Sequence, residues 1–199
     1  YNNALGRPEK KKIISRLGGY HGIAVSSGSL TGMPLMHQGF DLPIANILHT
    51  GNPHYYRHGL DGESEEDFAT RRAAELEQMI LAEGPETVAA FIAEPVLGAQ
   101  GAVPPPKTYF AKIQAVLKKY DVLMIADEVI CGFHRTGNAF ACETYGIEPD
   151  MVVVAKQLSS AYMPISAVVL NEKVYGPIRD FSDDNGILAT GFTYSGHPV

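Results

Sequence analysis

Cysteine is scarce in this sequence, with two among 199 residues. Cys131 and Cys142 are eleven positions apart, a spacing that matches neither a redox dithiol nor a zinc-binding pair. So low a cysteine content fits a reducing compartment. We therefore expect a cytoplasmic protein.

Positive charge is also in short supply. Lys and Arg number 16 against 22 Asp and Glu, which gives a net charge of −6. Nucleic-acid binding is driven largely by clustered Lys and Arg, so we expect no nucleic-acid partner. The run at residues 10–12 (Lys-Lys-Lys) is short and is expected to form a solvated face.

Long apolar runs are missing as well. No stretch approaches the roughly 20 residues that span a bilayer, so we expect no membrane-embedded segment and no membrane partner. The chain starts at Tyr1 instead of methionine, Gly6 with Arg7 and Pro8 indicates a helix end, and residues 195–198 (Ser-Gly-His-Pro) resemble a helix start. We expect a fragment of a longer chain, so that any targeting signal would lie upstream.

The overall composition is that of an ordinary globular protein, with 45% hydrophobic and 19% charged residues. Short apolar runs alternate with longer amphipathic stretches, which predicts an α/β fold with a mainly parallel sheet and flanking helices. The apolar character of the runs predicts strands that are buried on both faces. Predicted strands cover residues 12–15, 88–93, 122–126, 151–155 and 165–170, and predicted helices cover 64–82, capped by Ser64, and 109–120.

Polar residues follow four of the predicted strands at the places where a ligand would bind. In an open parallel sheet, ligands bind outside the carboxyl ends of the strands. We therefore expect these polar residues to converge on one edge of the sheet. They are Tyr20 and His21, Glu94, Asp127 and Glu128, and Lys156.

Lys156 and Asp127 are the residues whose chemistry is most specific. Lys156 ends the run Met-Val-Val-Val-Ala, where a primary amine acts either as a Schiff-base nucleophile or as a strand-end lysine that reaches solvent. Asp127 suits a magnesium site in a phosphate-transferring enzyme, but the chain has no Gly-Lys pair for the corresponding phosphate loop. It also suits the anion that pairs with the pyridine nitrogen of pyridoxal phosphate, and the lysine one strand later favours that use. The structural alternative is a helix cap or a carboxylate paired within the fold.

The remaining polar candidates are less specific. Tyr20 follows Gly18 and Gly19, which permit close backbone approach, and its ring could stack on a flat cofactor or belong to the core. His21 could orient a neighbour or be a satisfied loop residue. Three further histidines, at positions 49, 54 and 58, lack an evident carboxylate partner, and we expect no metal site.

Several motifs, in order, resemble the class III aminotransferases, also called the omega-aminotransferase group. No single motif is specific, but their order along essentially the whole chain is. They are residues 19–22 (Gly-Tyr-His-Gly), 93–96 (Ala-Glu-Pro-Val), 125–129 (Ile-Ala-Asp-Glu-Val), 132–137 (Gly-Phe-His-Arg-Thr-Gly), 154–156 (Val-Ala-Lys) with 162–165 (Tyr-Met-Pro-Ile), and 193–198 (Thr-Tyr-Ser-Gly-His-Pro).

The resemblance implies the aspartate-aminotransferase fold, called fold type I, with residues 1–199 as part of the large cofactor-binding domain. An N-terminal segment and a C-terminal small domain would be absent, together with a phosphate-binding Gly-Ser loop and a carboxylate-binding arginine. The resemblance also implies a pyridoxal-phosphate enzyme that acts as a homodimer, with the active site between subunits. Its site residues would be Lys156 as the Schiff-base lysine, Asp127 at the pyridine nitrogen, Tyr20 and Val129 on the two ring faces, His21 and Glu94 nearby, and Thr193 at the phosphate of the neighbouring subunit's cofactor.

The resemblance further implies transfer of an amino group from an amine or omega-amino acid to a 2-oxo acid. Gln157 and His134 stand where many members carry glycine, but neither removes a reacting group. Ile130 and Cys131 follow the Asp-Glu-Val triplet, as in the branch that uses pyruvate. We therefore expect pyruvate as acceptor. The alternatives are another pyridoxal-phosphate reaction, such as that of an aminomutase or decarboxylase, and a non-catalytic remnant.

Overall fold

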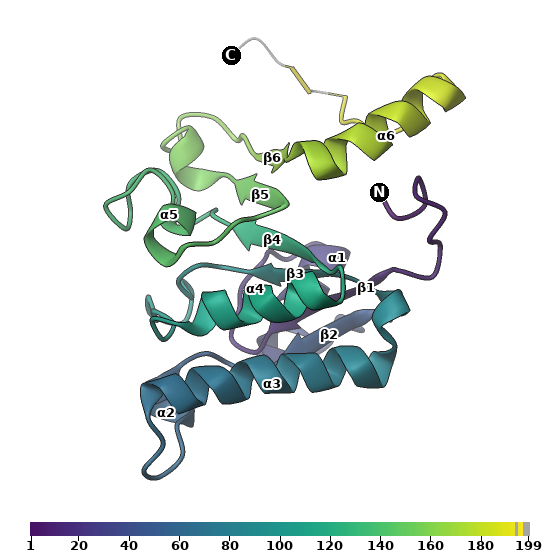
Figure 1. The fold of residues 1–199 in the computed structure, drawn as a ribbon. Coiled ribbons are helices and arrows are strands. Elements are labelled where there is room, and N and C mark those ends of the chain that lie inside the picture. Colours follow the sequence, from purple (N-terminus) through teal and green to yellow (C-terminus); the bar gives the residue numbers. More distant parts are fainter. Residues whose placement is uncertain (194, 197–199) are drawn as a thin grey trace.

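A six-stranded sheet forms the centre of the protein (Figure 1). A computed structural model describes residues 1–193, 195 and 196. The strand order is β2-β1-β3-β4-β5-β6; the strands from β2 to β5 pair in parallel, and β6 pairs antiparallel with β5. The prediction of a mainly parallel α/β sheet is confirmed. The strands are β1 (Lys12–Arg16), β2 (Ile47–Thr50), β3 (Val88–Ala93), β4 (Leu123–Asp127), β5 (Met151–Val154) and β6 (Ala167–Leu170).

Two long helices cover one face of this sheet. The helices α3 and α4 lie side by side in front of the strands, and α1 lies behind them (Figure 1). The prolines at 104–106 precede α4, and Gly84 with Pro85 ends α3. The helices are α1 (Val25–Leu30), α2 (Tyr55–His58), α3 (Glu65–Glu83), α4 (Tyr109–Lys119), α5 (Ala141–Tyr145) and α6 (Glu172–Asn185), with short 3₁₀ turns at Pro34–Met36, Pro85–Thr87 and Lys156–Leu158.

The predicted cap of α3 is confirmed at Ser64. Its Oγ accepts a hydrogen bond from Asp67 N–H at 3.1 Å, and the first turn carries three acidic residues that favour the positive end of the helix dipole. We expect Ser64→Ala to lower the free energy of unfolding by about 1 kcal/mol. Chemical denaturation measures this loss, and Ser64→Asp, which restores an acceptor, is the matched control. Equal stability of the Ala and Asp variants would contradict the role of the cap.

The core lies between the sheet and the helices α3 and α4. Ile14 and Phe91 from the sheet meet Leu76, Ile80 and Ile113 from the helices, and all five are fully buried. Each such side chain contributes about 1.5–3 kcal/mol by leaving water. This packing fixes β1, β3 and β4 relative to one another, and with them the loops that follow these strands.

Burial on both faces, expected for every predicted strand, is wrong for β6. Val168 and Val169 are 59% and 56% exposed, whereas β3 and β4 are almost wholly buried. The strand β6 is one of the two edge strands of the described sheet and pairs only with β5. An apolar sequence therefore identified the strand but not its place at the edge.

The basic run at 10–12 is not a uniformly solvated face, which corrects that prediction. Lys10 is buried, and its ammonium donates to the backbone carbonyls of Pro85 and Tyr120 at 3.1 and 3.2 Å. Lys12 pairs with Glu83 at 2.9 Å. Within the described residues, no helix is long and apolar enough to cross a bilayer.

A helix end was predicted at Gly6 and a helix start at residues 195–198. The described residues at both places form turns. Leu5 N–H donates to Tyr1 O at 3.1 Å, and Gly6 closes this turn with a left-handed φ of 69°. Ser195 and Gly196 also lie in a turn. His197 and Pro198, which complete the predicted helix start, are outside the described residues, as is Tyr194 of the neighbouring motif.

Candidate active site

The polar residues that follow the parallel strands lie together at the carboxyl-terminal edge of the sheet, as predicted. Tyr20 and His21 follow β1, Glu94 follows β3, Asp127 ends β4, and Lys156 follows β5. Because β1, β3, β4 and β5 are consecutive neighbours and parallel, their carboxyl ends meet at this edge. Asp127 pairs in register with Val153, so Lys156 lies three residues beyond the register partner of Asp127.

The carboxylate of Asp127 is buried and held from two sides. It is 5% exposed; Oδ1 accepts from Val129 N–H at 3.0 Å, and Oδ2 lies 2.8 Å from His21 Nδ1. A carboxylate can only accept here, so Nδ1 of the histidine carries the hydrogen. The His21 side chain is 2% exposed, and among the described residues its Nε2 has no hydrogen-bond partner. The pair therefore fixes the carboxylate in one orientation.

The backbone of Tyr20 is held by Glu94. One carboxylate oxygen of Glu94 accepts from Tyr20 N–H at 2.9 Å, and the other accepts from Gly98 N–H at 3.0 Å. Burial raises the pKa of Glu94, while these two backbone hydrogen bonds oppose the rise. Both oxygens are thus engaged with backbone, and direct contact of Glu94 with a cofactor stays a prediction.

The glycines before Tyr20 provide the close approach that the sequence predicts. Gly18 has a left-handed φ of 82°, and an added Cβ would collide with the side chains of Asn52 and Gln100. Gly19 packs against the His21 ring, where a Cβ would lie 3.2 Å from Nε2. The ring of Tyr20 is only half-buried, so it is available at the edge of the sheet.

Lys156 is exposed and begins the short turn after β5. Its φ of 40° is in the left-handed region, which is uncommon for a residue with a side chain. Its ammonium makes no hydrogen bond or ion pair within the described part of the chain. The next residue, Gln157, accepts from Arg135 Nη2 at 3.0 Å and so links this loop to the loop after β4.

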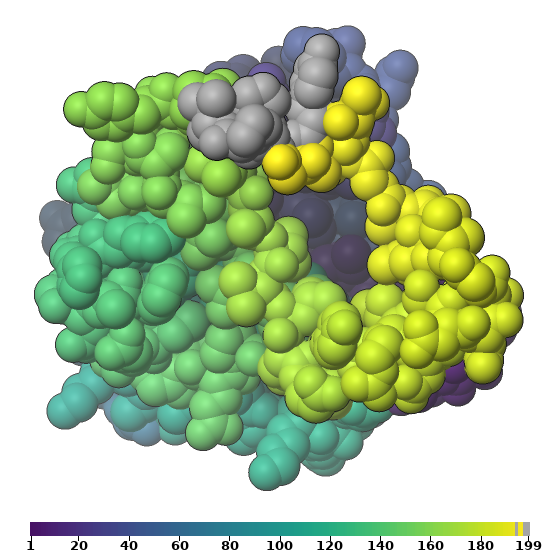
Figure 2. Space-filling view, turned by 90° about the horizontal axis from the view of Figure 1, so that it is seen from above, coloured from purple at the N-terminus to yellow at the C-terminus, as the bar shows by residue number. Residues whose placement is uncertain are grey.

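Val129 and Thr193 lie in different surroundings. Val129 is half-buried directly beside Asp127. Thr193 is exposed in the stretch after α6, which is coloured yellow in Figure 2 and borders a hollow with darker residues of the N-terminal region behind it. The predicted contacts of both residues with a cofactor stay predictions.

Two residues that organise this edge were missed by the sequence reasoning. Thr31, fully buried after α1, accepts from His21 N–H at 2.9 Å through Oγ1. Arg16, the last residue of β1, is 1% exposed and donates to the backbone carbonyl of Glu94. A basic residue at the end of an apolar strand is a signal that could have identified Arg16, whereas nothing in the sequence marks Thr31.

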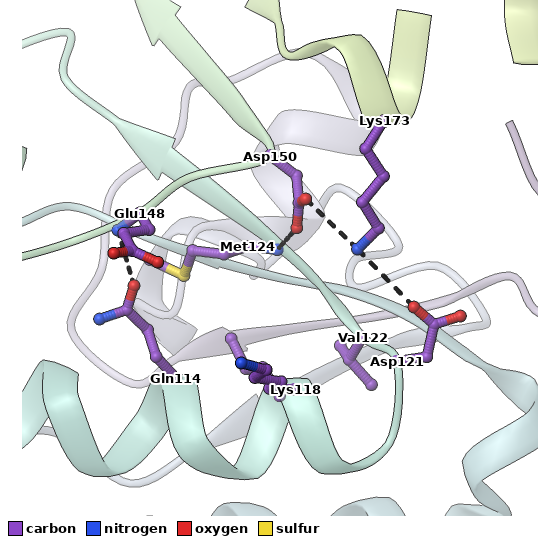
Figure 3. Close-up of a pocket in the computed structure, with 9 residues that line it drawn as sticks. Gln114, Lys118, Asp121, Val122, Met124, Glu148, Asp150 and Lys173 are labelled. Atoms are coloured by element: carbon purple, nitrogen blue, oxygen red, sulfur yellow. Dashed lines mark hydrogen bonds and ion pairs between the residues drawn. The ribbon is translucent and has the colours of Figure 1, made fainter. Parts of the chain in front are cut away.

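The opposite edge of the sheet carries a separate polar cavity of about 300 Å³ (Figure 3). Asp150 precedes β5 there and accepts from Met124 N–H at 2.9 Å, and Lys173 lies 3.4 Å from Asp150 and 3.7 Å from Asp121. These charges are already paired with one another. In the described part of the chain, no group of three His, Cys, Asp or Glu side chains is placed to hold a metal.

Comparisons with known proteins identify the family. The family model described as Aminotransferase class-III matches residues 1–199. The gamma-aminobutyrate transaminases 1 (mitochondrial) and 3 (chloroplastic) of Solanum lycopersicum are 61% and 60% identical over the whole chain, which spans 39% and 38% of their lengths.

Solved structures give the same result. A transaminase solved with L-ala has a TM-score of 0.97 and 65% identity, over 99% of this chain and 46% of that one. The omega transaminase of Pseudomonas jessenii in complex with PMP has a TM-score of 0.95 and 61% identity, over 97% and 43%. The fold is thus that of the matched part of these transaminases, and the chain belongs to the class III aminotransferases.

Proposed function

We propose that this protein is an aminotransferase that transfers an amino group from an amine or omega-amino acid to a 2-oxo acid. One observation supports this proposal most strongly. The buried carboxylate of Asp127 and the exposed Lys156 lie at the carboxyl ends of the adjacent parallel strands β4 and β5. The family's cofactor is pyridoxal phosphate, and it supplies an aldehyde and an electron-accepting ring when bound.

The residues at this edge fit that cofactor. An amine without a partner in the described residues suits an aldehyde, and a buried carboxylate suits a protonated pyridine nitrogen. In the proposed roles, Lys156 Nζ is the nucleophile and then the base that takes and returns a proton. The negative carboxylate of Asp127 would stabilise the protonated ring nitrogen, Tyr20 and Val129 would flank the ring, and Thr193 would bind the phosphate of a neighbouring subunit's cofactor. His21 keeps Asp127 in place.

Pyruvate is the proposed acceptor. Ile130 and Cys131 after the Asp-Glu-Val triplet support it, and a 65%-identical transaminase was solved with L-ala, the amino acid that corresponds to pyruvate. The names of the plant relatives support gamma-aminobutyrate as one donor to be tried. The full-length protein should show ping-pong kinetics with pyruvate and this donor.

A matched assay with 2-oxoglutarate in place of pyruvate tests the acceptor. Faster turnover with 2-oxoglutarate would overturn the pyruvate proposal and leave transamination intact. Product formation without any 2-oxo acid would instead favour a decarboxylase or aminomutase. Inactivity with every donor and acceptor, despite bound cofactor, would favour the non-catalytic alternative.

The hydrogen bond from His21 to Asp127 should matter for cofactor affinity. His21→Phe leaves Oδ2 of a buried carboxylate without its donor, and a hydrogen bond to a charged group contributes about 1.5–3 kcal/mol. We expect the dissociation constant for pyridoxal phosphate to rise at least about tenfold in an absorbance titration. His21→Asn, which can still donate, should lose less. Unchanged affinity in the Phe variant would contradict this role.

A homodimer is proposed as the working assembly. Apolar side chains around α1 are exposed on the described chain and are suited to burial against a second copy. They are Ile23, Val25, Leu35, Met36 and Phe40. Light scattering of the full-length protein tests this, and a monomer at micromolar concentration would contradict it.

The extent of the domain and the cellular location of the protein are also proposals. We propose that residues 1–199 are part of a larger cofactor-binding domain, since the chain spans less than half of each relative's length.

A cytoplasmic location stays a prediction, because relatives carry the words mitochondrial or chloroplastic in their names. Fractionation of cells that express the full-length protein tests it.

A further inference from the structure

Arg16 is the largest fully buried side chain of the structure and is incompletely paired. Its guanidinium carbon lies 5.7 Å from the ring centroids of both Tyr109 and Phe110, at the start of α4. Among the described residues, its Nε and Nη1 have no hydrogen-bond partner. A buried cation is costly, and an apolar side chain of similar size is often no less stabilising. Packing alone therefore does not account for an arginine here.

The hydrogen bonds of Arg16 and Glu94 connect the same two loops in opposite directions. Arg16 ends β1, and its Nη2 donates to the backbone carbonyl of Glu94, directly after β3. Glu94 in turn accepts from the backbone N–H of Tyr20, in the loop after β1. Each side chain thus holds the backbone of the other's loop. The remaining carboxylate oxygen of Glu94 accepts from Gly98 N–H, which fixes the carboxylate itself.

This arrangement determines where the Tyr20 loop is held. The preceding backbone is tied by Gly18 N–H to Gly32 O at 2.7 Å, and by Gly19 N–H to Arg16 O at 3.0 Å. At Tyr20 the backbone N–H has a different partner, the side chain of Glu94. The next residue is anchored separately, because His21 N–H donates to Thr31 Oγ1 at 2.9 Å. Loss of the Glu94 carboxylate would therefore free the backbone at Tyr20 itself, where the ring is attached, while the residues on both sides stay tied.

We propose that Arg16 and Glu94 are positioning residues that together hold the Tyr20 ring in place for the cofactor. The inference rests on the proposed function, because it assumes that Tyr20 contacts bound pyridoxal phosphate. Neither residue need touch the cofactor: Arg16 acts on Glu94, and Glu94 acts on Tyr20. The role differs from a purely structural one, because it should vanish when the ring of Tyr20 is absent.

A double-mutant cycle on the full-length protein tests this coupling. The probe is pyridoxal phosphate, titrated into the cofactor-free protein, and the readout is its dissociation constant from absorbance. Glu94→Gln keeps the size of the side chain but replaces one acceptor oxygen with a donor, so we expect about a tenfold rise, equivalent to about 1.4 kcal/mol. Tyr20→Leu should give a rise of about fivefold to tenfold. In the Tyr20→Leu background, Glu94→Gln should add less than about twofold.

Thermal unfolding of the cofactor-free protein separates positioning from folding. Glu94→Gln should lower the midpoint by the same amount with and without the tyrosine ring. Asp150→Asn is the matched control, because it removes a partly buried carboxylate that accepts a backbone N–H at the opposite end of the strands (Figure 3). That variant should lose stability while its cofactor affinity stays at the wild-type value.

Arg16→Lys provides a second route if Glu94→Gln does not fold. An ammonium can still donate to the Glu94 carbonyl but does not reproduce the planar guanidinium beside the Tyr109 and Phe110 rings, so affinity should fall less than in Arg16→Met. This difference, too, should disappear in the Tyr20→Leu background. Multiplicative effects in the two backgrounds would overturn the positioning role, while absence of any cofactor binding by the wild-type protein would overturn the proposed function on which it rests.

Discussion

Lys156→Ala is expected to abolish transamination, with turnover reduced at least about 10⁴-fold. The reason is that a single amine, Lys156 Nζ, is assigned both nucleophilic attack and proton transfer. Its position supports this, because it is exposed after β5 on strained left-handed backbone and makes no hydrogen bond within the described chain. Steady-state rates with pyruvate as acceptor measure the loss.

The matched control for this variant is Lys173→Ala. Lys173 pairs with Asp150 and Asp121 at the opposite edge of the sheet and should be dispensable for turnover. Borohydride reduction of the cofactor-loaded wild-type protein, followed by peptide mapping, should locate the cofactor on Lys156. A label on another lysine, or substantial turnover in Lys156→Ala, would remove Lys156 from its role.

Asp127→Asn should lower turnover by roughly a hundredfold or more. The amide has nearly the same shape, and its oxygen can still accept from Val129 N–H, but it carries no charge to stabilise a protonated ring nitrogen. Removing one partner from a buried charge pair costs about 3–5 kcal/mol, which sets the scale of the effect. Single-turnover rates of the first half-reaction measure it without interference from product release.

A second carboxylate variant separates charge from packing. Asp127→Glu keeps the charge but moves the oxygens away from His21 Nδ1, so it should retain more of the rate than the Asn variant if charge is the larger contribution. Comparable rates for wild-type and Asp127→Asn proteins would show that the carboxylate does not tune the cofactor. In that case Asp127 would be a structural residue that holds the His21 loop.

Much of the fold could be predicted because its central strands are apolar and its long helices are amphipathic. The bounds of β3 agree with the prediction, and α3 begins directly after the predicted cap at Ser64. The strand β2 was missed because its second half is polar, with His49 and Thr50 after two apolar residues. The helix α6 was missed because Gly176 and Pro177 interrupt its pattern, and α1 and α5 are too short to show a period.

The location of the site followed from topology, but its contacts did not. Parallel strands bring Tyr20, Asp127 and Lys156 to one edge wherever their side chains point. By contrast, the hydrogen bond of His21 with Asp127 joins residues 106 positions apart, and that of Glu94 with Tyr20 joins residues 74 apart. Such pairings depend on the order of the strands in the sheet, which the apolar pattern of each single strand does not specify.

The central claim is that Lys156 carries pyridoxal phosphate and exchanges it with amine substrates. The most direct test is the visible absorption spectrum of the full-length protein with pyridoxal phosphate, beside Lys156→Ala, after free cofactor is removed. We predict a lysine-dependent band that bleaches on addition of an amine donor and returns on addition of pyruvate. Absence of the band from the wild-type protein, or an identical band in the variant, would contradict the claim.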